Sequence, residues 1–345
     1  MKIIGAGISG LTAAYYLRDH NPVVYEKTGR VGGWIRTVEK EGFLFELGPR
    51  GFRPHPDTLQ LCHELGLKPL PCSKEAKKRF VLLGDQLKPF SLMLLLKNGL
   101  LKDLFTKPCQ KSDESIADFF RRHFSQNFVE NIVDPMVKGI YAGDAEMLSV
   151  KNCFPKLWEL DQKRGRLLQK PPKSGVSLYS FEKGMEELPK ALAKHVDVRF
   201  HTEATEGIIA CPWDNKPPYL SLTTVSMGWH CPLPKKGFGF LAPSKEKKRF
   251  LGMTWDSNVF PDQKGKGRIC VMTLEKNGKE IAQEAAERYL GLKNPDVILE
   301  HHCENAIPQY PVGYEKPGHL GHNCSVNDCI AKAKQFAAQE KKMRP

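Results

Sequence analysis

The chain opens with MKIIGAGISG, residues 1–10, in which long apolar positions run directly into the pattern Gly-x-Gly-x-x-Gly. Residues 11–17 (LTAAYYL) then have the pattern of a helix. A strand, a glycine turn and a helix in this order are typical of a dinucleotide-binding fold. In such a fold Gly5 makes the tight turn, Gly7 lets the backbone approach a pyrophosphate, and Gly10 lets helix and strand pack closely. The pyrophosphate would lie on the N–H groups at the start of the helix, where the helix dipole favours negative charge.

A second short strand and an acidic residue follow at the expected spacing. Residues 23–25 (VVY) are apolar or aromatic, and Glu26 comes 21 positions after Gly5. An acid at this distance is placed to accept hydrogen bonds from ribose hydroxyls. The alternative is a glycine turn in another α/β unit, with Glu26 as an ordinary exposed carboxylate. The complete order of elements favours the dinucleotide site.

The residues that follow distinguish FAD from NAD. Residues 30–36 (RVGGWIR) place two glycines between two arginines, which suits close approach of a diphosphate. Residues 43–47 (FLFEL) alternate like a strand and lead into GPRG at 48–51. The run E-x3-R-x-G-G that begins at Glu26 resembles the monoamine-oxidase-like flavoproteins. Within that superfamily, GWIR and FELGPRG are similar to the oxygen-dependent protoporphyrinogen oxidase family.

The resemblance implies an α/β protein with a Rossmann-type FAD-binding domain, an interleaved substrate domain and a helical membrane-associated domain. FAD is the implied cofactor, held by residues that match the family's motifs position by position. These implied cofactor-binding residues are Gly5, Ala6, Gly7, Ile8, Ser9, Gly10, Glu26, Lys27, Arg30, Gly33, Trp34, Gly48, Pro49, Arg50, Gly51, Ala204, Cys324, Ser325 and Val326.

The resemblance also implies a tetrapyrrole site. Arg79 precedes a short strand and would meet a propionate of the substrate, for which a fixed cation is suitable; the alternative is a surface arginine. Phe238, Leu241 and Met272 would form apolar walls for a flat macrocycle, although each also has an ordinary explanation as a core residue. The implied reaction oxidises protoporphyrinogen IX to protoporphyrin IX with O2 and releases hydrogen peroxide. We assign no catalytic side chain, because the sequence shows no Ser/His/Asp set and no suitable carboxylate pair.

Two stretches depart from the family pattern. Residues 211–236 contain five prolines, and only Tyr219 to Val225 could be a strand. Residues 313–323 are too polar and too short to be the apolar strand that precedes the family's C-terminal flavin motif, which CSVNDCI at 324–330 resembles. We therefore expect two strands of one sheet to be missing. This leaves open a truncated, non-catalytic relic or splice form, and another amine-oxidase-like flavoenzyme is a third possibility.

The expected organisation follows the resembling segments along the chain. The boundaries are 1–84 for the N-terminal part of the FAD-binding domain, 85–175 for the helical membrane-binding domain, 176–236 for the shortened continuation of the FAD-binding domain, 237–312 for the substrate-binding region, and 313–345 for the C-terminal flavin motif and tail.

Composition limits the possible partners. The chain has 345 residues and a formal net charge of +13, which attracts anionic partners. Because nothing resembles a nucleic-acid module, we expect no nucleic acid and favour an anionic membrane surface over a merely solvated basic one. Residues 87–105 are apolar but interrupted by lysines, and no segment reaches the ~20 apolar residues that span a bilayer. They fit either an interfacial segment or a buried helix, and the resemblance favours the first.

Location and metal content follow from other features. The ten cysteines form no C-x-x-C pair, so we expect thiols and no metal site. Because the glycine pattern starts almost at Met1, we expect no cleavable presequence, and a mitochondrial address would have to be internal. The resemblance implies a peripheral protein of the mitochondrial inner membrane and a possible homodimer.

Overall fold

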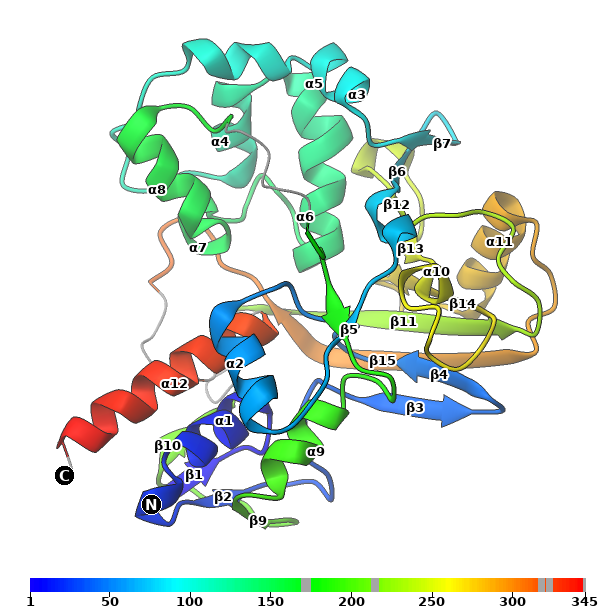
Figure 1. Ribbon diagram of the computed structural model, residues 1–345. Coiled ribbons are helices and arrows are strands. Elements are labelled where there is room, and N and C mark those ends of the chain that lie inside the picture. The colour runs from blue at the N-terminus through cyan, green and yellow to red at the C-terminus, as the bar shows by residue number, and fades with distance from the viewer. Residues whose placement is uncertain (169–174, 212–216, 316–319, 321–324, 344–345) are drawn as a thin grey trace.

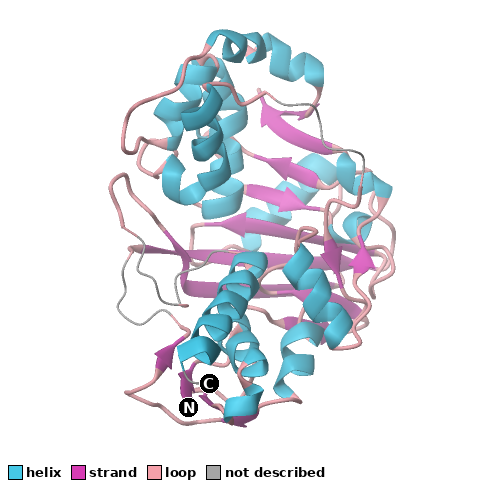
Figure 2. Ribbon diagram, turned by 60° about the vertical axis from the view of Figure 1, so that its left-hand side comes forward, coloured by secondary structure: helices cyan, strands magenta, loops and turns pink. Residues whose placement is uncertain are grey.

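The computed structural model describes residues 1–168, 175–211, 217–315, 320 and 325–343. Its elements form a small parallel sheet with its helices, a larger mixed sheet and a helical cluster (Figure 1). In Figure 2 the strands of the larger sheet cross the middle of the molecule, between the helical cluster at the top and the smaller sheet at the bottom.

The N-terminal glycine segment lies in the small parallel sheet. Its elements are β1 (Lys2–Ile4), β2 (Val23–Tyr25), β9 (Asp197–Arg199), β10 (Ile208–Ile209), α1 (Ile8–Tyr16), α2 (Pro56–Glu64), α9 (Glu187–Ala193) and α12 (Val326–Met343). The strand order is β10-β1-β2-β9, and all pairs are parallel. Nearly every residue of α1 is buried, because this helix packs on the sheet and against α12 and α9. Ile3, Leu11 and Ile330 belong to the resulting core and are fully buried.

The sheet ends at β10. Ile208 and Ile209 pair with Ile3 and Ile4 of β1, and no strand of the described residues continues the sheet beyond them. Within the described residues, the glycine turn therefore lies one strand from this edge of the sheet.

The larger sheet carries the second core. Its elements are β6 (Arg79–Leu83), β7 (Gln86–Pro89), β11 (Tyr219–Trp229), β12 (Gly239–Leu241), β13 (Gly252–Thr254), β14 (Gly267–Thr273) and β15 (Val297–Pro308), with α10 (Asp256–Val259) and α11 (Lys279–Leu290). The order is β15-β11-β14-β13-β12-β6-β7, and β12 and β6 are the parallel neighbours. Phe240, Met253, Val271 and Val225 occupy paired positions of four adjacent strands and share a buried cluster with residues of α11. Because strand side chains alternate, residues of the opposite parity face the other side of the sheet.

Two expectations about this region need correction. We expected a strand only from Tyr219 to Val225, but β11 continues to Trp229. We also expected residues 176–236 to return to the FAD-binding part, whereas β11 lies inside the larger sheet, between β15 and β14. The physical reason is burial: residues 222–229 are all buried, and such a strand needs backbone partners on both edges. Similarly, β6, which we expected in the segment 1–84 of the first domain, lies in the larger sheet.

The remaining short elements belong to neither of these sheets, and their strands form two separate pairs, β3 with β4 and β5 with β8. They are β3 (Thr37–Lys40), β4 (Phe43–Glu46), β5 (Leu70–Pro71), β8 (Tyr179–Ser180), and the 3-10 turns η1 (Arg18–His20), η2 (Lys74–Lys77) and η5 (Ser244–Glu246). All four residues of β4 are buried, so this strand is more enclosed than its alternating pattern predicts. Phe43 and Phe45 pack with Val297 of β15, which brings the segment after β4 to the boundary between the sheets.

A helical cluster covers the end of the larger sheet near β6 and β12 (Figure 1). It contains α3 (Leu92–Lys97), η3 (Leu100–Phe105), α4 (Ile116–His123), α5 (Gln126–Phe128), the π-helical turn η4 (Val129–Val133), α6 (Asp134–Tyr141), α7 (Val150–Cys153) and α8 (Pro155–Arg164). Its core is rich in aromatic side chains, among them Phe119, Phe124 and Trp158. Within the described part of the chain, none of the helices has the length and apolar character needed to cross a membrane.

Candidate functional site

The glycine turn between β1 and α1 has the shape that a pyrophosphate needs. A Cβ on Gly10 would lie 2.0 Å from the carbonyl oxygen of Gly5, so only glycine lets α1 pack this closely on the turn. Gly5 has a φ of +100°, which favours glycine. A Cβ on Gly7, by contrast, would meet no atom within 4 Å, so open space lies beside the start of α1. The residues present therefore fit a phosphate group approaching the backbone at Gly7.

Glu26 is buried and has a structural role in the turn. Its Oε2 accepts a hydrogen bond from the N–H of Ala6 at 2.8 Å, and its Oε1 accepts from the N–H and hydroxyl of Thr28 at 2.9 and 2.7 Å. A carboxylate offers about four acceptor sites, so one remains for a ribose hydroxyl. Lys27, the next residue, is exposed.

The second glycine segment, Gly32 and Gly33, crosses the turn that holds Ala6 and Gly7. The N–H of Gly32 donates to the carbonyl of Ala6 at 2.8 Å, and a Cβ on Gly33 would lie 3.2 Å from the Cα of Gly7. Arg30 donates to the carbonyl oxygens of Val31, Ile35 and Gly33, so its guanidinium holds this turn in place instead of standing free. Trp34 is 45% exposed beside it.

The GPRG segment makes two close backbone approaches. A Cβ on Gly48 would lie 1.8 Å from the carbonyl oxygen of Trp34, and one on Gly51 would lie 2.5 Å from that of Tyr179. Pro49 and Arg50 come between these two contacts. The sequence GPRG is therefore fixed by its crossings with two other segments, and these crossings place Arg50 at the boundary between the sheets.

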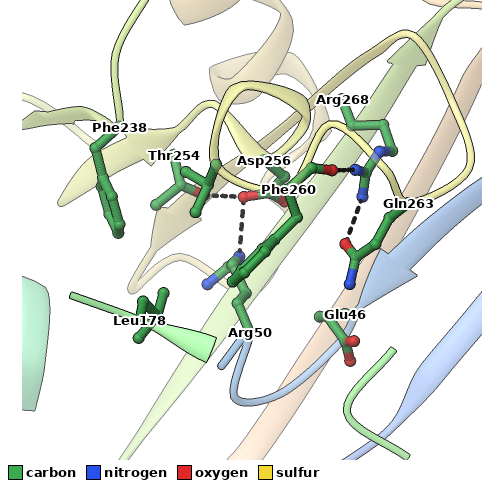
Figure 3. A pocket seen from close by; sticks show the side chains of 10 residues that line it. Glu46, Arg50, Leu178, Phe238, Thr254, Asp256, Phe260, Gln263 and Arg268 are labelled. Carbon is green, nitrogen blue, oxygen red and sulfur yellow. Dashed lines mark hydrogen bonds and ion pairs between the residues drawn. The ribbon is translucent and has the colours of Figure 1, made fainter. Parts of the chain in front are cut away.

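Arg50 has unused hydrogen-bond donors. Its Nε lies 3.4 Å from Oδ1 of Asp256, which in turn accepts from the Thr254 hydroxyl at 2.7 Å (Figure 3). Nε and Nη2 are buried, and neither makes a hydrogen bond with another described residue. Buried polar atoms normally have partners, so these two atoms fit a ligand that brings acceptors. A small cavity lies here, lined by Glu46, Arg50, Leu178, Phe238, Thr254, Asp256, Val259, Phe260, Gln263 and Arg268.

Glu46 at the edge of this cavity is the most perturbed acid of the site. It is 5% exposed, and burial raises its pKa to about 7, although the N–H of Met185 and the hydroxyl of Thr37 both donate to its carboxylate. Our sequence reasoning missed Glu46 and Asp256. Glu46 could have been found from the sequence, because it is an acid within the apolar run 43–47. Asp256 had no such signal, because its role depends on Arg50, which is remote in sequence.

The implied substrate residues lie near one another in two groups. The guanidinium of Arg79 stacks 4.7 Å from the centre of the Phe238 ring, and Phe238 lines the cavity beside Arg50. Leu241 pairs with Gly252, and Gly252 with Met272, so Leu241 and Met272 share one face of the larger sheet. Arg79 pairs with Gly239 and shares that face. Leu241 also contacts α6, since a Cβ on Gly139 would lie 2.6 Å from its Cδ2.

The C-terminal residues are only partly placed. Cys324 lies outside the described residues. The Ser325 hydroxyl accepts from the N–H of Asp328 at 3.1 Å, and Val326 is buried in the same core as α1. The first turn of α12 is tied to the segment after GPRG, because Asn327 donates to the carbonyl of Arg53 at 3.0 Å. Ala204 lies in the loop between β9 and β10 and is partly buried.

No group of three His, Cys, Asp or Glu residues in the described part of the chain is placed to hold a metal ion. The histidines of β15 have other roles: Nδ1 of His302, for example, lies 2.9 Å from the Thr223 hydroxyl. The geometry that fits ligands lies at the glycine segments, where a phosphate can approach Gly7, and at the cavity beside Arg50, which we call the ligand space between the two sheets.

Comparisons with known proteins agree with this geometry. The model of the flavin containing amine oxidoreductase family matches residues 8–206. Protoporphyrinogen oxidase of Homo sapiens is 31% identical over 463 aligned positions that cover 97% of each chain. The mitochondrial protoporphyrinogen oxidase of Nicotiana tabacum is 25% identical and covers 96% of this chain and 87% of its own. A solved structure from Exiguobacterium sp. 255-15, provisionally assigned as a protoporphyrinogen oxidase, has a TM-score of 0.78 at 18% identity over 99% of this chain and 98% of that one, and so shows the fold.

These matches settle the family and the cofactor. The amine oxidoreductase match and the protoporphyrinogen oxidase relatives make the chain an oxidoreductase with FAD as its cofactor. The expected shortening is also confirmed, because 345 residues spread over 463 aligned positions leave parts of the human protein without a counterpart. The roles of the individual residues stay predictions. The chain belongs to the protoporphyrinogen oxidases within the flavin-containing amine oxidoreductase family.

Proposed function

We propose that this chain oxidises protoporphyrinogen IX to protoporphyrin IX with FAD and O2 and releases hydrogen peroxide, as a step of haem synthesis. The observation that carries the proposal is the pairing of Arg79 with Phe238 next to the free donors of Arg50. A cation against an aromatic wall suits a flat macrocycle with carboxylate arms. In three rounds six hydrogens leave the substrate, and three O2 become three H2O2; bound FAD supplies this redox chemistry.

The chain's own residues bind the cofactor and orient the substrate. The open space at Gly7 receives the pyrophosphate, and the remaining acceptor site of Glu26 receives a ribose hydroxyl. Arg79 neutralises a propionate, while Leu241 and Met272 present apolar surface on the same face of the sheet. No side chain is assigned to acid–base work, so the rate depends on how well these residues hold the substrate and exclude water.

The shortened sheet makes the non-catalytic relic the relevant alternative, although the matches to active-enzyme families do not favour it. Purification of the whole chain followed by visible absorption spectroscopy tests for bound flavin. Addition of protoporphyrinogen IX under air should then give porphyrin fluorescence and peroxide in step. Absence of the flavin bands would reject the enzyme proposal, and flavin without fluorescence would leave a binding-only protein.

We also propose that the helical cluster lies on an anionic membrane surface, with a peripheral place on the mitochondrial inner membrane. The support is a set of exposed apolar side chains on α3 and η3, among which Leu92, Met93 and Phe105 are 64%, 63% and 85% exposed. Exposed apolar patches on this scale mark interaction sites, and the segment 86–111 carries five lysines against one acidic residue, Asp103. Flotation of the purified chain with lipid vesicles tests the placement. The homodimer is a further proposal, tested by light scattering of the purified chain.

A further inference from the structure

A groove opens beside the exposed apolar segment of the helical cluster. It has a volume of about 490 Å³, and its walls include Lys102, Phe105, Thr106, Lys107 and Arg122. Three of these five side chains are cationic, and none is acidic. The groove is separate from the glycine segments and from the ligand space between the sheets, so the proposed oxidase reaction gives it no role.

The cations of the groove differ in how far they are neutralised. Arg122 is paired with Glu114 at 2.6 Å and with Asp161 at 2.8 Å, so its charge is compensated from behind. The ammonium of Lys102 donates only to backbone, namely to the carbonyl oxygens of Arg121 and Phe124 at 2.7 and 3.1 Å. These bonds fix the ammonium in position without cancelling its charge.

Lys107 is the least constrained of the three. Its side chain is exposed, and among the described residues no carboxylate lies within ion-pair distance of Lys107 or of Lys102. The Nε of Arg122 is also buried without a hydrogen-bond partner in the described part of the chain. Two uncompensated ammonium groups around one cavity favour an anion there.

The groove is held in shape by a buried carboxylate. Asp103 of η3 is fully buried and accepts from the N–H groups of Leu167 and Leu168 at 2.9 and 2.7 Å. Nδ1 of His123 lies 2.6 Å from the same carboxylate. These contacts join η3 to α4 and to the segment after α8, so the walls that carry Lys102 and Phe105 stand on a fixed base.

The short helix η3, which contributes Lys102 and Phe105 to the groove, also carries exposed apolar side chains that we call the apolar rim. Leu101, Leu104 and Phe105 belong to the same short helix as Lys102 and are 57%, 42% and 85% exposed. A free phosphate would engage the ammonium groups alone and leave this rim in water. A phosphate that carries acyl chains would satisfy both, because its charge meets the lysines while its chains continue along the rim into hydrocarbon.

We propose that this groove binds the phosphate of an anionic phospholipid headgroup, while Leu101, Leu104 and Phe105 enter the hydrocarbon layer. This inference rests on the proposed membrane placement and adds to it a defined headgroup site and a preference for anionic lipid. Lys107 supplies most of that preference, because its charge is uncompensated and its side chain is free to reach the phosphate.

The test uses the whole flavin-loaded chain and vesicles of phosphatidylcholine with or without phosphatidylglycerol. Lys107→Gln should weaken binding to the anionic vesicles about fivefold and leave binding to neutral vesicles unchanged. The matched control is Lys97→Gln, which replaces an exposed lysine of α3 that does not line the groove. Its loss of affinity for the anionic vesicles should be less than half as large. Lys107→Arg should retain the preference, and Phe105→Ser should weaken binding to both kinds of vesicle.

Four results would overturn the inference. Equal losses for Lys107→Gln and Lys97→Gln would show diffuse surface attraction in place of a site. Tight binding of inorganic phosphate in the absence of vesicles, followed by calorimetry, would show a site for a soluble anion. Failure of the unmodified chain to bind any vesicle would reject the membrane placement itself, whereas binding to both kinds of vesicle without regard to charge would leave that placement standing and reject only the headgroup site.

Discussion

Replacement of Glu46 by Gln should change how the stability of the protein depends on pH. Burial raises the pKa of Glu46 to about 7, whereas the same group in the unfolded chain titrates near 4.5. Because the folded state then holds the proton more tightly, stability falls as pH rises through the interval between these values and levels off above the upper one. The difference between the folded and unfolded pKa of Glu46 corresponds to about 3 kcal/mol of folding stability in total. About 2 kcal/mol of this stability is lost between pH 5 and pH 7.

The glutamine variant should lose this slope. Its amide oxygen can accept from the N–H of Met185, and its NH2 can donate to the hydroxyl of Thr37, so both existing contacts of Glu46 have counterparts. Urea unfolding of wild type and variant at pH 5, 6, 7 and 8 measures the difference, and the exposed Glu182→Gln serves as control. The free energy of unfolding of Glu46→Gln, relative to that of wild type, should increase steadily from pH 5 to 7. A constant difference across the series would show that Glu46 is ionised in the folded protein throughout, and the burial argument would fail.

Further substitutions test the site. Gly7→Ala should leave stability within about 1 kcal/mol, because its Cβ meets no atom, yet lower FAD affinity at least tenfold in a flavin-fluorescence titration, whereas Gly10→Ala should fail to fold. Asp256→Ala should cost about 3 kcal/mol in urea unfolding because Arg50 is left unpaired; the exposed Arg249→Ala should cost less than about 1 kcal/mol. Arg79→Ala should raise KM about tenfold for the tetrapyrrole and leave the flavin spectrum unchanged.

Local sequence was enough to predict the cofactor half of the protein. Gly5, Gly7 and Gly10 act through their immediate neighbours, so the order of strand, turn and helix followed from residues close together in the chain. The larger sheet was harder to predict. β11 follows a proline-rich stretch, and its eleven residues are stabilised by β14 and β15, which lie far along the chain. No local pattern carries that pairing, and so the strand was predicted too short, within a segment assigned to the FAD-binding domain.

The same distinction explains why side chains between the sheets escaped prediction. Glu46 comes from a strand near the glycine segments, while Asp256 and Arg268 come from the larger sheet and the helix beside it. Each looks ordinary in its own segment, and only the folded chain brings them around Arg50.

The arrangement also shows which part of the site the shortening affects. The glycine turn, Glu26 and Arg50 are supported by β1, β2 and β4 or by the segment after β4. The sheet stops at β10, on the side away from β9. We therefore predict that a cofactor held at Gly7 makes its pyrophosphate and ribose contacts with this part of the chain, while the edge beyond β10 lacks a described neighbour. Affinity for FAD and turnover should for this reason respond separately to changes in the chain: substitutions at Gly7 act on the first, and substitutions at Arg79 act on the second.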